Sequence, residues 1–354
     1  MRFSQKTSLM LWGTLFFCTS AAAQDVSVRR VTDRVIVLSM SNLGMHTNIT
    51  VIESQKGLVI IETEITPYIM SKIKAEAEKY LGRNDWIYVI NTHNHLHHAA
   101  GNILFRDAQV VGHETMRMDW LENRLSTESG RRGYCDTVGT IDGLSKLRKA
   151  LAQGGLTPQQ ERDIRRKIRF MRDVEKEIMN GFEIRNPDIT FNDRFTLDIG
   201  DVHLRLIYWG NAVQHSSIII HVVEDNMLVS TGIGSGWLPN FYGKANQNSI
   251  QRWIAILDEL CDDKFRIDTI IGVHSADFFT TKQNLQYKHE YLSELLDGLK
   301  NAKKLGLSLE QTKKELAFDK RFSRFRRIYN KPENLNEKHL ENINVIWNLL
   351  YAEK

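Results

Sequence analysis

The first third of the chain alternates apolar runs with short turn-forming stretches. Apolar, β-branched runs cover residues 34–40, 47–54 and 57–63, and Asn, Gly and Lys residues separate them. Runs of this length and composition, broken by such residues, are typical of strands. We therefore expect three consecutive strands that form an antiparallel meander.

The pattern then changes to helical spacing. Thr66-Pro67 is a typical helix start, Ile69 and Ile73 recur on one face, and Gly82 is placed where a helix would end. The apolar run at residues 86–90 reads as a buried strand. We predict a helix between Thr66 and Gly82, followed by that strand.

The remaining periodicity predicts further elements of both kinds. Strands are expected at residues 103–105, 108–111, 187–199, 202–209, 217–223, 227–230 and 269–273, a helix at 247–261, and a charged helical region at 282–354. Such a mixture predicts an α/β protein.

Residues 126–180 differ in character from their surroundings. They open with a Gly-rich polar stretch that we expect to be a loop, and they continue in two charged helical patterns, at 144–153 and from Thr157 onward. The basic run Arg165-Arg166-Lys167 is typical of a solvated helix face.

The N-terminus has the pattern of an export signal. Basic Arg2 and Lys6 precede an apolar stretch, and small residues end at Ala23. This predicts a signal peptide over residues 1–23 and a periplasmic or secreted protein, the alternative being an N-terminal membrane anchor. No apolar stretch after it is long enough to predict an integral span.

Cysteine content and charge set limits on the mature chain. Two cysteines remain after the signal, Cys135 and Cys261, either as isolated thiols or as a disulfide. A net charge of +4 in 354 residues is too small a bias to indicate a nucleic acid partner.

Four histidines follow the predicted strand at 86–90 within six positions: His93, His95, His97 and His98. A fifth, His274, directly follows the predicted strand at 269–273. Neutral imidazole is a common ligand for zinc and iron, and ligands on a turn after a strand can converge on one ion. The alternative is a histidine-rich surface loop or a hydrogen-bonded cap, but this density favours a metal site.

The string Thr92-His93-Asn94-His95-Leu96-His97-His98 resembles the Thr-His-x-His-x-Asp-His motif of the metallo-β-lactamase superfamily. The resemblance implies an αββα four-layer sandwich over residues 24–300, a helical insertion at about 126–180, and a helical C-terminal extension at 301–354. It also implies hydrolysis at a site of two metal ions that takes its ligands from several loops.

The chain departs from the superfamily pattern at several ligand positions. His97 stands where the motif has Asp, and Ile233 replaces the Asp of Thr-Gly-Asp in Thr231-Gly232-Ile233. Val213 aligns with a ligand His, and His215 lies two residues later, so that it either reaches the metal or hydrogen-bonds elsewhere. His274 fits the last ligand position.

The lost carboxylates change the expected metal content. Two divalent ions without a protein anion between them repel by several kcal/mol at ~4 Å. We therefore expect one ion, zinc with iron as an alternative, held by His93, His95 and His215 or by His97, His98 and His274. If His97 is not a ligand, it is the candidate general base.

Acidic residues near the predicted site have two interpretations. Glu62 lies at the end of the predicted strand at 57–63 and Glu64 directly follows it, where the superfamily often has Asp-x-Gly or Asp-Thr. We expect Glu62 to orient an imidazole, the alternative being a surface charge. His113, at the end of another predicted strand, is expected to have a structural role.

The sequence therefore supports competing functions. The first is an exported metal-dependent hydrolase that cleaves an ester, a thioester or an amide such as a β-lactam in a small-molecule substrate. The second is a binding or sensing protein in which the fold persists without hydrolysis, and the third is a redox or oxygen-using iron site.

Overall fold

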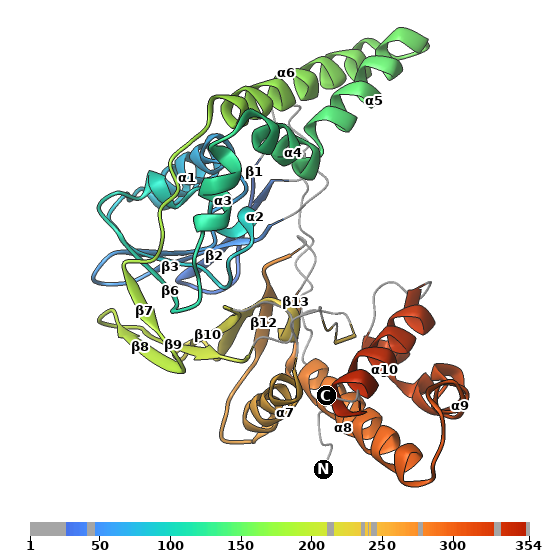
Figure 1. Cartoon of the computed structure of the whole chain (residues 1–354). Coiled ribbons are helices and arrows are strands. Elements are labelled where there is room, and N and C mark those ends of the chain that lie inside the picture. The colour runs from blue at the N-terminus through green and yellow to red at the C-terminus, as the bar shows by residue number, and fades with distance from the viewer. Residues whose placement is uncertain are drawn as a thin grey trace, which may run out of the picture.

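The computed structural model describes residues 26–40, 47–210, 216–234, 238–239, 241, 246–274, 279–328 and 334–351, without the side chains of Leu96 and Gln247. Two β-sheets form its centre, and helices lie on their outer sides (Figure 1). Among the described residues, no helix is long and apolar enough to cross a membrane.

The first sheet has seven strands that neighbour one another in sequence order. They are β1 (Val26–Arg30), β2 (Val35–Met40), β3 (Ile49–Glu53), β4 (Leu58–Ile61), β5 (Trp86–Ile90), β6 (Gln109–His113) and β7 (Ile189–Phe191). The pairs from β1 to β4 are antiparallel, and those from β4 to β7 are parallel. The predicted meander is confirmed, and β1 adds a strand that we did not predict.

The second sheet has six strands. In spatial order they are β13 (Phe279–Thr280), β12 (Thr269–Gly272), β11 (Met227–Ser230), β10 (Ile218–Val222), β9 (His203–Tyr208) and β8 (Arg194–Asp198). Only β11 and β12 are parallel neighbours within it. The single strand predicted at 187–199 was wrong, because its first part pairs with β6 as β7 and its second part pairs with β9 as β8.

Helices cover the outer face of each sheet. The first sheet is flanked by α1 (Pro67–Leu81) and the insertion helices α3 (Asp119–Leu125), α4 (Glu128–Val138), α5 (Thr140–Gln153) and α6 (Pro158–Asn180) (Figure 1). The second is flanked by α7 (Gln247–Cys261), α8 (Lys282–Lys304), α9 (Leu309–Glu315) and α10 (Leu335–Tyr351). The expected division at residue 300 stays a prediction, and it falls inside α8.

Three buried apolar clusters correspond to these layers. One lies between the sheets, with Val59 and Ile90 from the first and Leu204 and Ile220 from the second. The others lie between each sheet and its helices. Alternate residues of the strands thus face different cores, which confirms the predicted four-layer αββα sandwich.

The Gly-rich stretch after residue 126 is helical, so the predicted loop was wrong. Thr127 caps α4 by accepting from the backbone N–H of Gly130. A Cβ at Gly130 would lie 1.9 Å from the carbonyl oxygen of Arg124, and one at Gly143 would lie 2.6 Å from Met171. These glycines permit close packing between helices, whereas we had interpreted them as turn residues of a loop.

The thiols of Cys135 and Cys261 are free, and they contribute to different apolar clusters. Of the two alternatives, isolated thiols or a disulfide, the structure therefore agrees with isolated thiols.

Gly101 follows the histidine-rich turn, and we expect its replacement by Ala to destabilise the protein by about 1–3 kcal/mol. A Cβ there would lie 2.2 Å from the carbonyl oxygen of Thr63 and 2.6 Å from Met70. Denaturant unfolding would measure the loss, with Gly133→Ala as control, since the added Cβ would approach only the end of the Arg124 side chain, at 3.3 Å. Equal stability of the two variants would contradict this packing argument.

Candidate metal centre

The candidate centre lies where the ends of β5 and β12 approach each other at one edge of the sandwich. His93 is in the turn after β5, His98 is in the short helix α2 (Leu96–Ala99), and His274 comes two residues after β12. Thr47 and His274 form an isolated antiparallel β-bridge, and the side-chain amide of Asn48 donates to the carbonyl oxygen of Gly272. These contacts, one between backbones and one from a side-chain amide to a backbone carbonyl, join the two sheets next to the imidazoles.

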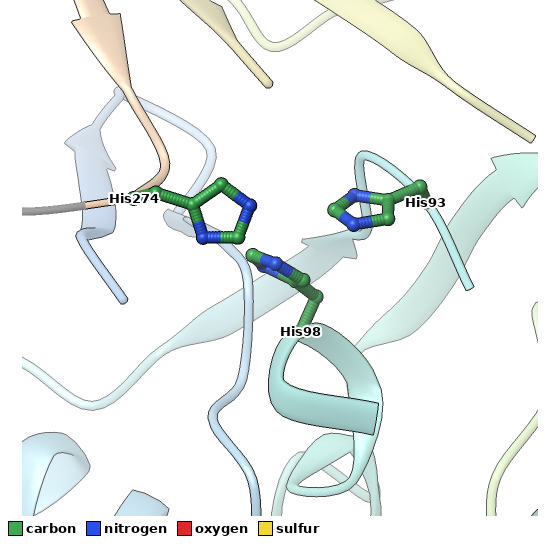
Figure 2. Close-up of side chains that lie close together, drawn as sticks. All are labelled: His93, His98 and His274. Carbon is green, nitrogen blue, oxygen red and sulfur yellow. The ribbon is translucent and has the colours of Figure 1, made fainter. Parts of the chain in front are cut away.

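Three of the imidazoles bring their ring nitrogens together. One ring nitrogen from each of His93, His98 and His274 lies within 4.8 Å of the others. The rings point toward a common space from three separate segments (Figure 2). The His98 ring centroid is 4.2 Å from that of His93 and 4.8 Å from that of His274. Such a set is suited to a single cation.

His95 and His97 are next to this group and partly exposed. The ring centroid of His95 is 4.6 Å from that of His93, and the ring centroid of His97 is 5.2 Å from that of His274. The ring centroids of the predicted set of His97, His98 and His274 also lie close together, at 4.1, 4.8 and 5.2 Å from one another. His215 and Val213 lie outside the described residues.

His98 is held from two sides. Its backbone carbonyl accepts from Asn91 Nδ2 at 2.7 Å and from the Thr63 backbone N–H at 2.9 Å. Its Nδ1 is 2.7 Å from Glu62 Oε2, and neither side chain is exposed. The two atoms are close enough for a hydrogen bond but are not aligned for one, so neither has a hydrogen-bond partner in the described part of the chain. Nδ1 is therefore turned toward Glu62.

The nitrogens turned away from these contacts are available for a ligand. His98 Nε2 is fully buried and has no hydrogen-bond partner among the described residues. His93 Nδ1 lies 2.9 Å from Thr92 Oγ1, which leaves its Nε2 for the space between the rings. A buried imidazole nitrogen without a partner is costly unless something else binds it.

Burial and mutual proximity keep these imidazoles neutral. Desolvation, followed by the neighbouring imidazoles, lowers the pKa of His93 and of His98 well below the usual value. The same causes lower the pKa of His274 to about 4 and that of His97 to about 2. Neutral imidazole is the form that ligates metals, so the donor set matches a cation.

Glu62 is the buried carboxylate behind His98. Its Oε1 accepts from the Thr92 backbone N–H at 2.8 Å, and its backbone has a φ of 74°, in the left-handed region. Burial raises the pKa of this carboxyl to about 8. The expected role in orienting an imidazole matches this position, because the contact leaves His98 Nε2 facing the other rings.

Replacing Glu62 by Gln is expected to weaken metal binding by about 10–100-fold while leaving a folded protein. The amide keeps the shape but cannot ionise, so it cannot provide a carboxylate beside His98 Nδ1 when a cation binds on the other side of the ring. Zinc titration against a competing chelator would measure the change. The matched control is Glu224→Gln, which removes a carboxylate beside the exposed His203. An unchanged affinity in Glu62→Gln would show that the pair does not support the centre.

The position of the second lost carboxylate is occupied by an apolar core residue. Ile233 is fully buried in the cluster between the second sheet and its helices. Lys288 of α8, also fully buried, donates to the carbonyl oxygens of Gly232 and Ile233 at 2.9 and 2.8 Å. No sequence pattern indicates Lys288, because its partners are backbone atoms 55 and 56 positions away.

His113 lies in the wall of the sandwich. Its Nδ1 lies 2.7 Å from Thr115 Oγ1, its Nε2 lies 3.0 Å from Asn192 O, and its ring stacks on Tyr208 with centroids 3.8 Å apart. Both nitrogens have partners, which agrees with the structural role expected of it.

Comparison with known proteins gives the following similarities. The model of the metallo-beta-lactamase superfamily matches residues 43–231, more than half of the chain. No curated protein matches the chain.

Solved structures share the fold at low sequence identity. A sec-alkylsulfatase, Pisa1 from Pseudomonas sp., has 14% identity and a TM-score of 0.56, and the match covers 92% of this chain and 50% of the sulfatase. A double mutant of that sulfatase has 14% identity and a TM-score of 0.55, and the match covers 93% of this chain and 51% of the mutant. The chain thus spans about half the length of these enzymes. A metallo-beta-lactamase from Pontibacter korlensis has 12% identity and a TM-score of 0.48 over 76% of this chain and 99% of its own.

Proposed function

Because the chain belongs to the metallo-beta-lactamase superfamily, we propose that it is a hydrolase that depends on one divalent metal ion held by His93, His98 and His274. The observation that carries the proposal is the convergence of three imidazoles, one ring nitrogen of each within 4.8 Å of the others. Their burial and neutral state suit ligation.

The residues present fit a metal ion. His98 Nε2 is a buried acceptor without a partner among the described residues, and the neighbouring rings offer nitrogens of the same kind. Three imidazoles with an open position are typical of catalytic zinc, while iron also accepts such ligands. A cation there supplies a Lewis acid and activates water for hydrolysis.

One ion fits the donor set better than two. The superfamily motif offsets two ions with carboxylates, but His97 and Ile233 occupy those positions here. The nearest buried carboxylate, Glu62, contacts His98 rather than the space between the rings. Two cations at ~4 Å would then repel by several kcal/mol.

The remaining histidines have supporting roles in the proposal. His95 and His97 border the site and, with His215, are additional candidate ligands. The low pKa of His97, about 2, argues against its predicted role as general base, because so weak a base has little tendency to take a proton from water at neutral pH. The chemistry of His97 is better suited to ligation.

The substrate proposal is an ester, thioester or amide of a small molecule. We add sulfate esters to the proposed substrates, because the solved structure whose match covers 92% of this chain is that of an alkylsulfatase. We also propose that residues 1–23 direct export to the periplasm or beyond, as their composition predicts.

Hydrolysis assays before and after metal removal test the proposal. Lactam, thioester, aryl ester and alkyl sulfate substrates would be offered to the native protein, to the chelator-treated protein and to protein resupplied with zinc or iron. We expect activity that disappears with the metal and returns with it. Metal-loaded protein that hydrolyses none of these substrates would contradict the hydrolase proposal.

A second candidate function is a binding or sensing protein with the same fold. The observation that favours it is the absence of carboxylates at positions 97 and 233. In that case the metal-loaded protein would bind a ligand at the centre without turnover, which calorimetry with the same substrates would detect.

A further inference from the structure

The α5–α6 hairpin carries a concentration of positive charge that the metal centre does not explain. Residues 140–180, which form the hairpin, include ten basic and six acidic residues, so this segment alone has a net charge of +4, as much as the whole chain. Two of the acids, Glu161 and Asp163, pair with arginines of their own helix, and Asp173 and Glu177 accept hydrogen bonds from Tyr68. The hairpin therefore has an unbalanced positive charge.

Five of the cations are in register along α6. Arg162, Arg165, Arg169, Arg172 and Lys176 follow one another at spacings of three or four residues, and all are exposed. At 3.6 residues per turn they form one stripe about 80° wide and about 21 Å long. We call these five residues the basic row.

The opposite face of α6 is fixed in the core. Its buried residues, which pack against the rest of the first helical layer, are Ile168, Met171, Val174 and Ile178. Since these residues lie on the other side of the helix, the basic row faces away from the protein.

Few of these cations have ion-pair partners. Within the described part of the chain, Arg165 is the member of the basic row with a carboxylate partner, Glu161. Arg162 donates to Gln159, and the neighbouring Asp173 accepts from the Tyr68 hydroxyl. A solvated helix face usually forms ion pairs four residues apart along its length, and among the described residues Arg165 is the member of this row that does so.

The shape of the surface restricts the partner. Figure 1 shows the α5–α6 hairpin extending away from the sheets, so that the row lies on a straight, convex element. Residues 140–180 contain one aromatic residue, Phe170, and it is buried. Nucleic acid sites on single strands combine cations with aromatic stacking, which this surface lacks.

We propose that the basic row docks the hairpin onto an anionic phospholipid surface. Guanidinium groups bind phosphate oxygens in a bidentate manner, and a flat layer of headgroups can contact every member of a straight row at once. Polybasic helix faces near a membrane are attracted to anionic lipids in this way. α5 adds the exposed cations Lys146, Arg148 and Lys149.

Sedimentation of the full protein with lipid vesicles tests this proposal. The vesicles contain phosphatidylcholine alone or with phosphatidylglycerol, at salt from about 0.1 M to about 1 M. We expect binding to the phosphatidylglycerol vesicles at low salt only. Replacing Arg162, Arg165, Arg169 and Arg172 by Gln is expected to weaken it by about tenfold or more.

A matched variant separates the row from total charge. The control variant replaces four exposed lysines of the C-terminal helical region by Gln, and so removes the same charge: Lys300, Lys304, Lys314 and Lys320. This variant should bind the vesicles as the native protein does. Two double variants, Arg162/Arg165 and Arg169/Arg172, should each show a partial loss, which keeps the test valid if the fourfold variant misfolds.

Several results would overturn the proposal. They are failure of the native protein to bind anionic vesicles, equal losses in the row and control variants, and unchanged binding in both double variants. Binding to a DNA oligonucleotide instead of vesicles, lost in the row variant, would assign the row to nucleic acid and overturn the lipid assignment.

Discussion

Replacing His98 by Ala is expected to reduce metal affinity by about a thousandfold or more and to abolish any metal-dependent activity. His98 is the ring closest to both others, and its Nε2 is the buried nitrogen without a partner. Its loss also leaves Glu62 buried without its 2.7 Å contact. Competitive zinc titration measures the affinity.

The matched control is His203→Ala. His203 also pairs with a glutamate, Glu224 at 2.7 Å, but about half of its side chain is exposed and it is on the second sheet. This variant should bind metal as the native protein does. Equal affinities in His98→Ala and His203→Ala would exclude His98 as a ligand.

Replacing Glu64 by Gln is expected to stabilise the protein near pH 8 by a few kcal/mol and to have little effect near pH 4.5. Burial raises the pKa of this carboxyl from 4.5 to about 8. Between these values the folded state binds more protons than the unfolded state, so the native protein loses stability as pH rises. Gln keeps an acceptor for the Ile65 backbone N–H but does not titrate.

The pH dependence separates this effect from backbone strain. Glu64 has a φ of 58°, which Gly adopts more readily, so Glu64→Gly should relieve backbone strain at every pH. Because glycine does not titrate, this variant should also lose the dependence of stability on pH. Denaturant unfolding across pH 4.5 to about 8 measures it, with Glu128→Gln as control because that carboxylate is exposed and paired with Arg132. A Glu64→Gln variant whose stability follows the native pH profile would refute the buried-charge explanation.

Local patterns were sufficient to predict most of the strands around the site, while the four-layer sandwich was implied by the resemblance to the superfamily. The alternation in 34–63 predicts β2 to β4, and the apolar run at 86–90 predicts β5 directly before the histidines. These segments are regular because their side chains face a core on each side. The predicted helix at 144–153 corresponds to most of α5, but α4 and the first residues of α5 were missed, since the glycines that normally break a helix serve close packing there.

The candidate site was predictable in its members but not in its grouping. The spacing of His93, His95, His97 and His98 and the position of His274 after a strand identified the segments. Which rings converge depends on how α2 turns His98 between Glu62 and the other imidazoles, and that geometry depends on contacts between distant residues. For the same reason, spacing could not indicate Lys288 behind Ile233.

The metal content of the purified protein tests the central claim most directly. After saturation with zinc and removal of free ions, elemental analysis against protein concentration gives the number of ions per chain. The arrangement of His93, His98 and His274, without a carboxylate between them, predicts one ion. Two ions per chain, or none, would contradict it.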